Sequence, residues 1–280
     1  MSPVVGRQGG QVEVSEVDQE ASQRAYARLA GLMYLVVLAL DVAGVVITSS
    51  VSGGGTFADI SQRISASEVL YRIGLCAGLF GALSTIVLAV SLYVAVKPAD
   101  ANLALTALLF RVVETAIAAM AIASGFALLQ LHLDATRAGA LVAPQLAAMA
   151  HLLGSGVGTS ISAIFFCVGS TIFFYLFWRS RYIPRILAGW GMFASGLYLL
   201  AFLGSLILPQ SAGLLQAMGS LPILIAELST ALWLLIRGID IGRSVAPPTV
   251  DLARIANAQK SISDSSFTTE ENDVERFGGH

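Results

Sequence analysis

The sequence predicts an all-α integral membrane protein, a bundle of six transmembrane helices with both termini in the cytoplasm. Three observations predict this fold class. Hydrophobic residues make up 56% of the 280 residues and charged residues only 12%, whereas soluble domains carry about 25% charged residues. The apolar residues are gathered in long runs, and the basic residues between these runs lie mainly on one side of the predicted membrane.

Six apolar runs are long enough to cross a bilayer. A spanning helix needs about 20 mostly apolar residues, because it rises 1.5 Å per residue through a hydrocarbon core of about 30 Å. Lipid offers no hydrogen-bond partners to an open backbone, so continuous runs of this length are expected to be helical. The expected spans are residues 29–47, 69–96, 103–131, 152–178, 186–208 and 214–236.

Turn-forming residues separate these runs. Residues 50–55 are rich in serine and glycine and predict a loop between the first two spans. Residues 97–100, Lys-Pro-Ala-Asp, predict a tight turn between the second and third. Pro144 is placed to begin the fourth helix, and Pro209 to end the fifth.

Clustered glycines inside the spans predict close packing between helices. Residues 154–158, Gly-Ser-Gly-Val-Gly, have neither the preceding strand nor the following lysine of a phosphate-binding loop. We therefore interpret them as a face of small residues that lets two helices approach each other. The same interpretation applies to Gly74, Gly78 and Gly81.

Basic residues in the short loops predict the orientation, because lysine and arginine are enriched on the cytoplasmic side. One side holds Arg63 and Arg137, with Arg72 near the helix edge. The other, predicted to be cytoplasmic, holds Arg24, Arg28, Lys97, Arg179, Arg181, Arg185, Arg237 and Arg243. The expected organisation is a polar cytoplasmic segment (1–24), a transmembrane domain (25–240) and a polar cytoplasmic tail (241–280) that we predict to be disordered.

Four ionisable residues lie inside the predicted spans, where charge is costly and usually serves a function. They are Asp41 in the first span, Arg111 and Glu114 in the third, and Glu227 in the sixth. Counted from the cytoplasmic ends of their helices at 1.5 Å per residue, they lie about 13–20 Å deep. The four residues should therefore form one charged layer near the middle of the bilayer.

The composition of this layer suggests a ligand-binding site. Arg111 stays protonated, so we expect it to pair with Glu227 or with Glu114, because an unpaired buried charge is very costly. The two remaining acids would then be protonated, or would hold an exchangeable cation or a basic ligand.

A second group of polar residues, Glu68, Arg72, His132 and His151, is predicted near the outer surface. Glu68 and Arg72 are four residues apart on one helix and should form an ion pair. The two histidines, with Asp134, could offer two nitrogens and an oxygen to a metal. Because no HExxH-like spacing is present, no metal site is predicted. No cofactor is predicted, and a net charge of −2 without a basic stripe excludes nucleic acid as a partner.

Several short motifs occur at the ends of the spans or within them. They are Ala27-Arg-Leu-Ala-Gly-Leu-Met-Tyr34, Tyr71-Arg-Ile-Gly-Leu75, Leu109-Phe-Arg-Val-Val-Glu114, Tyr182-Ile-Pro-Arg-Ile-Leu187 and the run from Glu227 to Gly238. In their order and spacing they resemble one bacterial family of membrane proteins, a domain of unknown function (DUF 4386). The resemblance covers roughly residues 24–240 and implies six spans in a bacterial inner membrane. It implies no activity, and the polar C-terminal tail looks like an addition to the family's core.

Three functions are consistent with these patterns, all with the lipid bilayer as a partner. In the first, the charged layer binds or transports a small ligand or a proton. In the second, a structural or accessory protein uses buried ion pairs to hold its helices together. In the third, a membrane-embedded enzyme acts on a lipid or apolar substrate, with His132, His151 and the acids as acid–base groups. The oligomeric state stays open.

Overall fold

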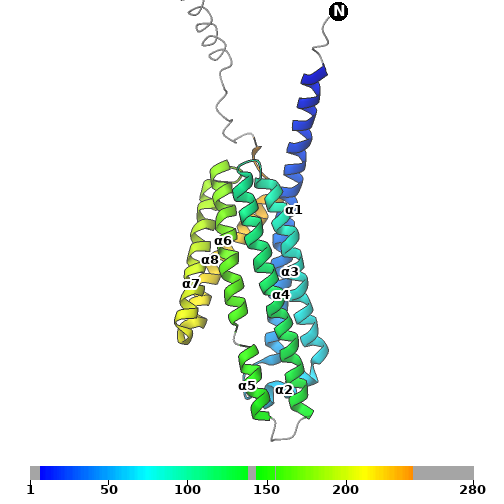
Figure 1. Cartoon of the computed structure of the whole chain (residues 1–280), viewed down its shortest axis with the longest axis vertical. Helices are drawn as coiled ribbons and strands as arrows, with labels where there is room; N and C mark the ends of the chain where they lie inside the picture. The colour runs from blue at the N-terminus through cyan, green and yellow to red at the C-terminus, as the bar shows by residue number, and fades with distance from the viewer. Residues whose placement is uncertain (1–6, 138–142, 155, 242–280) are drawn as a thin grey trace, which may run out of the picture. The chain divides into compact units, whose positions relative to one another are not determined.

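The computed structural model describes residues 7–137, 143–154 and 156–241, and within them it is helical without strands (Figure 1). Six candidate spans are long and apolar enough to cross a membrane, which confirms the predicted number. The predicted tail falls almost wholly outside the described residues. The helices are α1 (Arg7–Ser52), α2 (Phe57–Ala66), α3 (Glu68–Val96), α4 (Ala101–Arg137), α5 (Ala143–Leu153), α6 (Val157–Ser180), α7 (Arg185–Ile207), the 3-10 turn η1 (Pro209–Ser211) and α8 (Ala212–Ile236).

The six long helices pack as a ring. Each packs against the next in chain order, from α1 to α3, α4, α6, α7 and α8, and α8 returns to α1. Large apolar side chains cover the outside, as a lipid-facing surface requires: Ile186 is 88% exposed and Phe80 is 61% exposed. The two short helices α2 and α5 lie at one end of this ring (Figure 1), which we call the α2–α5 end.

The opposite end, the arginine end, carries Arg24 and Arg28 of α1 together with Arg237 at the end of α8, and these residues line one pocket. Both ends of the described chain therefore lie at the same end of the ring, as an even number of spans requires. The assignment of this end to the cytoplasm stays a prediction from the distribution of basic residues.

The first predicted loop is shorter than expected, and this part of the prediction was wrong. Helix α1 continues through Ser52, and the hydroxyls of Ser50 and Ser52 are satisfied within it because they donate to carbonyl oxygens of the preceding turn. The loop consists of residues 53–56, in which Gly53 and Gly55 adopt positive φ. It leads into α2, a helix that was not predicted.

Helix α2 begins with a reciprocal cap. The Thr56 hydroxyl accepts a hydrogen bond from the Asp59 N–H (3.3 Å), and the Asp59 carboxylate accepts one from the Thr56 N–H (3.1 Å). Hydrogen bonds from Thr56, the side-chain hydroxyl first, hold the pKa of the Asp59 carboxyl below its ordinary value. Arg63 then ties the loop down by donating to the carbonyl oxygens of Ser52 (2.6 Å) and Gly54 (2.8 Å).

At the other end, the tight turn predicted at residues 97–100 is present. The Asp100 carboxylate accepts hydrogen bonds from the Leu103 N–H (3.1 Å) and the Arg179 guanidinium (3.1 Å). The Leu103 N–H, and after it Arg179, holds the pKa of the Asp100 carboxyl below its ordinary value. This carboxylate therefore caps α4 and links it to the end of α6.

The fourth span differs from the prediction of one helix starting at Pro144. A helix does begin there, but it is the short α5, which ends at Leu153, and α6 begins only at Val157. Gly156 has a φ of 72°, a left-handed conformation that ends the regular helix. Gly158 follows the break and lies against α4, where an added Cβ would be 3.4 Å from the Ala121 Cβ. The small-residue interpretation therefore holds for Gly158, whereas nothing lies within 4 Å of a Cβ added to Gly156.

Glycines bring α1 into close contact with its neighbours. A Cβ added to Gly44 would lie 3.0 Å from the carbonyl oxygen of Gly74 and 3.1 Å from the backbone nitrogen of Gly78. Small side chains at this contact were expected from the sequence and are confirmed for α1 and α3. On the other side of α1, a Cβ added to Gly31 would lie 2.5 Å from the backbone nitrogen of Leu235 in α8.

Replacing Gly31 by alanine is expected to destabilise the protein by about 1–3 kcal/mol, because rigid backbone of α8 would have to move away. The measurement is the thermal unfolding midpoint of purified protein in detergent. Gly196→Ala is the matched control, since nothing lies within 4 Å of its added Cβ; it should be neutral or slightly stabilising. Equal midpoints for the two variants would contradict the close α1–α8 contact.

Candidate functional site

The four ionisable residues predicted to share one layer line a single cavity of about 280 Å³. Asp41 comes from α1, Arg111 and Glu114 from α4, and Glu227 from α8. These helices reach the cavity from different sides of the ring, so the structure brings together all four residues. Their role in binding a ligand stays a prediction.

Arg111 forms its ion pair with Glu114, the second of the two expected partners. Its Nη1 atom lies 2.9 Å from a Glu114 carboxylate oxygen, three residues along the same helix. Arg111 is buried, at 3% exposed, and the Glu114 side chain is largely buried, at 13% exposed. Because both residues are on α4, this ion pair does not connect two helices.

The rest of the Arg111 side chain packs against α6. Its Cζ lies 4.7 Å from the centre of the Phe166 ring, a cation–π contact. Gly169 makes room for the aliphatic stem, since a Cβ added there would lie 3.2 Å from Arg111 Cγ. Nη1 is held in the ion pair with Glu114, whereas the buried Nε atom makes no hydrogen bond to any described residue. The guanidinium group therefore keeps an unused N–H donor in a residue that lines the cavity.

Asp41 and Glu227 form no ion pair with any described residue. The Asp41 carboxylate lies directly against Gly81 of α3, where no side chain intervenes. Glu227 is half-buried on α8 and lines the cavity together with Tyr34. Since Glu114 balances Arg111, these two carboxyl groups leave the cavity with an excess of acidic groups.

A second cavity, of about 510 Å³, continues from the first towards the α2–α5 end. The two share Asp41, Thr85 and Glu114 among their lining residues. Further along, the second cavity is lined by residues closer to the α2–α5 end, including Thr48 of α1 and Ile122 of α4. The charged layer is thus reached through space between the helices on this side.

Towards the arginine end the interior is filled instead. A cluster of buried apolar residues begins at Tyr34 and Leu88, both of which also line the charged cavity. It continues through Leu92, Phe173 and Phe177. The cavity therefore has a closed floor on the arginine side and continuing space on the other.

Five polar residues of the cavity were missed from the sequence. Ser162 donates from its hydroxyl to the carbonyl oxygen of Glu114 (3.0 Å) and so connects α6 to α4. Thr85 donates to the Gly81 carbonyl oxygen within its own helix (3.1 Å). The available signal was a polar residue inside an apolar run, a common feature of helix packing in membranes. The five are Tyr34, Thr85, Thr159, Ser162 and Tyr198.

The outer group does not form a comparable site. The predicted pair of Glu68 and Arg72 is confirmed at 2.7 Å. His132 is buried under α2, where its Nδ1 lies 2.8 Å from the Ser61 hydroxyl and its ring 4.9 Å from that of Phe57. His151 is exposed on α5. Among the described residues, no three His, Cys, Asp or Glu side chains are placed to hold a metal ion.

Comparison with known proteins identifies the family to which the chain belongs but no activity. No curated protein and no solved structure matches the chain. The family described as a domain of unknown function, DUF4386, matches residues 29–238, which include all six spans and all four residues of the charged layer. The chain therefore belongs to the DUF4386 family.

Proposed function

We propose that this protein binds a small, positively charged ligand in the cavity lined by Asp41, Arg111, Glu114 and Glu227. The observation that supports it best is that Asp41 and Glu227 line the cavity without an ion-pair partner among the described residues. Three carboxyl groups around one guanidinium favour a cationic occupant, because carboxylates in a region of low dielectric strongly attract opposite charge.

The size and surroundings of the cavity fit a small molecule. Its volume of about 280 Å³ is near the lower end of the range for ligand pockets, about 300–1,000 Å³. Arg111 offers the N–H of its Nε atom, which has no hydrogen-bond partner among the described residues, to an acceptor on the same ligand. A small protonated amine that also carries a hydroxyl or carbonyl group would satisfy both kinds of residue.

The path to this site favours entry from the α2–α5 end. The second cavity leads from the charged layer in that direction, whereas packed apolar side chains close the arginine side. A receptor needs only this opening, and a transporter needs the apolar cluster to open in a second conformation. Binding is therefore the part of the proposal that the described conformation supports.

The structural alternative, in which buried ion pairs join the helices, has less support. The ion pair in this layer lies within α4. The contacts that these residues make between helices are a cation–π contact, a hydrogen bond and packing against glycines, and none of them is an ion pair. The enzyme alternative relied on His132 and His151, but His132 is engaged with Ser61 and Phe57 in packing α2.

The proposal is tested by the thermal stability of protein in phosphatidylcholine nanodiscs with added NaCl, choline chloride or putrescine dihydrochloride. A bound cation stabilises the folded state, by about 2.7 kcal/mol at 100 times its dissociation constant. We expect one of these cations to raise the unfolding midpoint of the wild type, and Asp41→Asn or Glu227→Gln to abolish the effect.

Asp134→Asn removes the same charge from an exposed position and is the control, which should respond like the wild type. The same stabilisation in all variants would place the cation elsewhere and contradict the proposal. Strong destabilisation by both neutral substitutions without ligand would show that the acids stabilise the bundle, and would favour the structural alternative. If no cation stabilises the wild type between pH 5 and 8, the proposal of a cationic ligand is wrong.

A further inference from the structure

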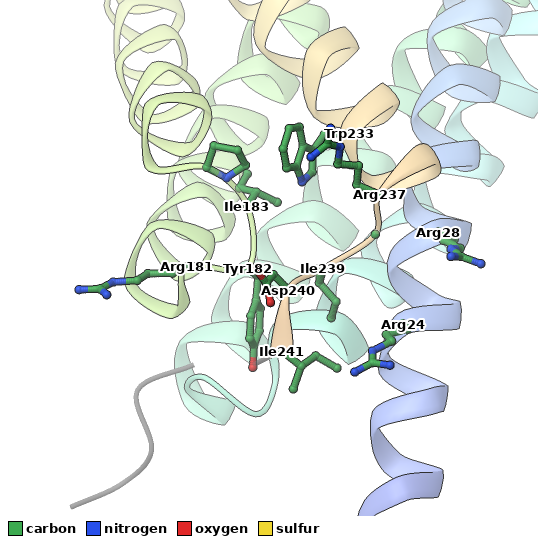
Figure 2. A pocket seen from close by; sticks show the side chains of 12 residues that line it. Arg24, Arg28, Arg181, Tyr182, Ile183, Trp233, Arg237, Ile239, Asp240 and Ile241 are labelled. Carbon is green, nitrogen blue, oxygen red and sulfur yellow. The ribbon is translucent and has the colours of Figure 1, made fainter. Parts of the chain in front are cut away.

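A third pocket, of about 520 Å³, lies at the arginine end, away from the charged layer. It is formed by the N-terminal part of α1, the turn at residues 181–184 between α6 and α7, and the end of α8 with the segment that follows it (Figure 2). Four arginines line it: Arg24, Arg28, Arg181 and Arg237. None of these arginines lines either of the two cavities beside the charged layer.

The positive charge of this pocket is poorly compensated. Its lining contains one carboxylate, that of Asp240. Arg24 pairs with Glu20 of the preceding turn at 3.3 Å, with both side chains more than half exposed, where such pairs are weak. Arg28, Arg181 and Arg237 form no ion pair with any described residue.

Other basic residues at this end are engaged differently. Arg179 pairs with Asp100 at 3.1 Å, and Arg185 lies over the Trp178 ring at 5.4 Å. Neither residue lines the pocket. Of the basic side chains at this end without an ion-pair partner among the described residues, Arg28, Arg181 and Arg237 line the pocket, whereas Lys97 and Arg185 lie outside it.

Backbone hydrogen bonds hold the wall of the pocket together. The Asp240 N–H donates to the Tyr182 carbonyl oxygen (3.1 Å), which fixes the segment after α8 against the turn between α6 and α7. Gly238 has a φ of 70°, and its N–H donates to the Leu234 carbonyl oxygen (3.0 Å). Tyr182 and Ile239 are buried. The pocket is thus a defined concavity formed by three segments of the chain.

Apolar and charged groups line different parts of this pocket. Pro184 and Ile241 contribute partly exposed hydrocarbon, and Ile183 and Ile239 are buried. Trp233 lies beneath the Arg237 guanidinium at 5.1 Å. Figure 2 shows Arg24 and Arg237 flanking this wall, with the side chains of Arg28 and Arg181 extended outward on opposite sides. Tryptophan and tyrosine at the ends of spans are typical of the membrane–water interface.

We propose that this pocket binds the phosphate group of an anionic phospholipid. Guanidinium groups bind phosphate oxygens through paired N–H donors, and basic pockets between helix ends on the cytoplasmic side hold anionic headgroups. Pro184, Ile241 and the Trp233 ring, which are partly exposed, supply a surface for the first part of the acyl chains. A free phosphate ion would use the arginines equally but would gain nothing from this apolar wall.

The test is native mass spectrometry of the full chain, titrated with phosphatidylglycerol against phosphatidylcholine. We expect selective binding of phosphatidylglycerol by the wild type. In Arg24→Gln with Arg237→Gln the affinity should fall roughly 30-fold, on the basis of about fivefold for each basic side chain near an anionic surface. Should that double variant fail to fold, the single variant Arg24→Gln removes one of these charges from an exposed position and should reduce the affinity about fivefold.

Lys97→Gln with Arg185→Gln is the control, because it removes two basic groups from the same end outside the pocket lining. Undiminished binding in this control supports the pocket. An equal loss in the control would indicate general attraction to the charged face and would overturn the proposal. Displacement of the lipid by an equal concentration of inorganic phosphate would identify a free phosphate site and would overturn the assignment to a lipid.

Discussion

Replacing Arg111 by leucine is expected to lower the free energy of unfolding by about 3–5 kcal/mol, the usual effect of leaving one member of a buried ion pair without its partner. Arg111 is 3% exposed, and its guanidinium lies 2.9 Å from the Glu114 carboxylate. The substitution also removes the cation–π contact with Phe166. Denaturant unfolding of purified protein in mixed micelles would measure the change.

The double variant Arg111→Leu with Glu114→Leu is the informative control. It removes both charges, so most of the lost stability should return, as double-mutant cycles show for residues that interact directly. Glu227→Leu is the matched alternative partner, and combining it with Arg111→Leu should restore much less. Recovery with Glu227→Leu and none with Glu114→Leu would contradict the ion pair described within α4.

Replacing Phe177 by alanine is expected to cost about 3 kcal/mol in stability. Its ring is 1% exposed in the apolar cluster that closes the arginine side of the charged cavity. The substitution removes a large buried side chain and leaves a void, and packing contacts are a main source of stability between helices in lipid. The unfolding midpoint in nanodiscs would report the effect.

Phe80→Ala provides the comparison, because the Phe80 ring is 61% exposed on the outside of the ring of helices. Lipid or detergent can fill the space left by that ring, so its loss should change stability by well under 1 kcal/mol. A similar cost for both substitutions would mean that the arginine side is not packed as described.

The spans were predictable because their signal is long and strong, whereas α2 and α5 were not. Helix α2 is a ten-residue helix in which polar and apolar residues are mixed, and its start was marked only by Thr56 and Asp59 three residues apart. That spacing is a capping signature, with aspartate in the usual place of glutamate or glutamine. The break before α6 depends on the backbone conformation of Gly156, which composition does not reveal.

The charged layer was also predictable from the sequence only in part. Residue counting along straight helices was sufficient to place Asp41, Arg111 and Glu227 at similar depth, because the rise per residue is constant. The partner of Arg111 depended on how the helices are rotated about their axes. Sequence spacing alone allowed two ion-pair partners for Arg111: Glu114, three residues along the same helix, or Glu227 on another helix. The polar lining by Tyr34 and Tyr198 depends on the same rotations.

The position of Glu114 three residues after Arg111 also has a consequence for biosynthesis. A salt bridge between neighbouring turns forms as soon as the helix itself forms, so the third span can enter the lipid with its two opposite charges already neutralising each other. Asp41 and Glu227 are the sole acidic residues within the apolar runs of the first and sixth spans. Each of these spans enters the lipid with an uncompensated carboxyl group. The favourable insertion free energy of its long apolar run must offset the cost of placing that group in lipid.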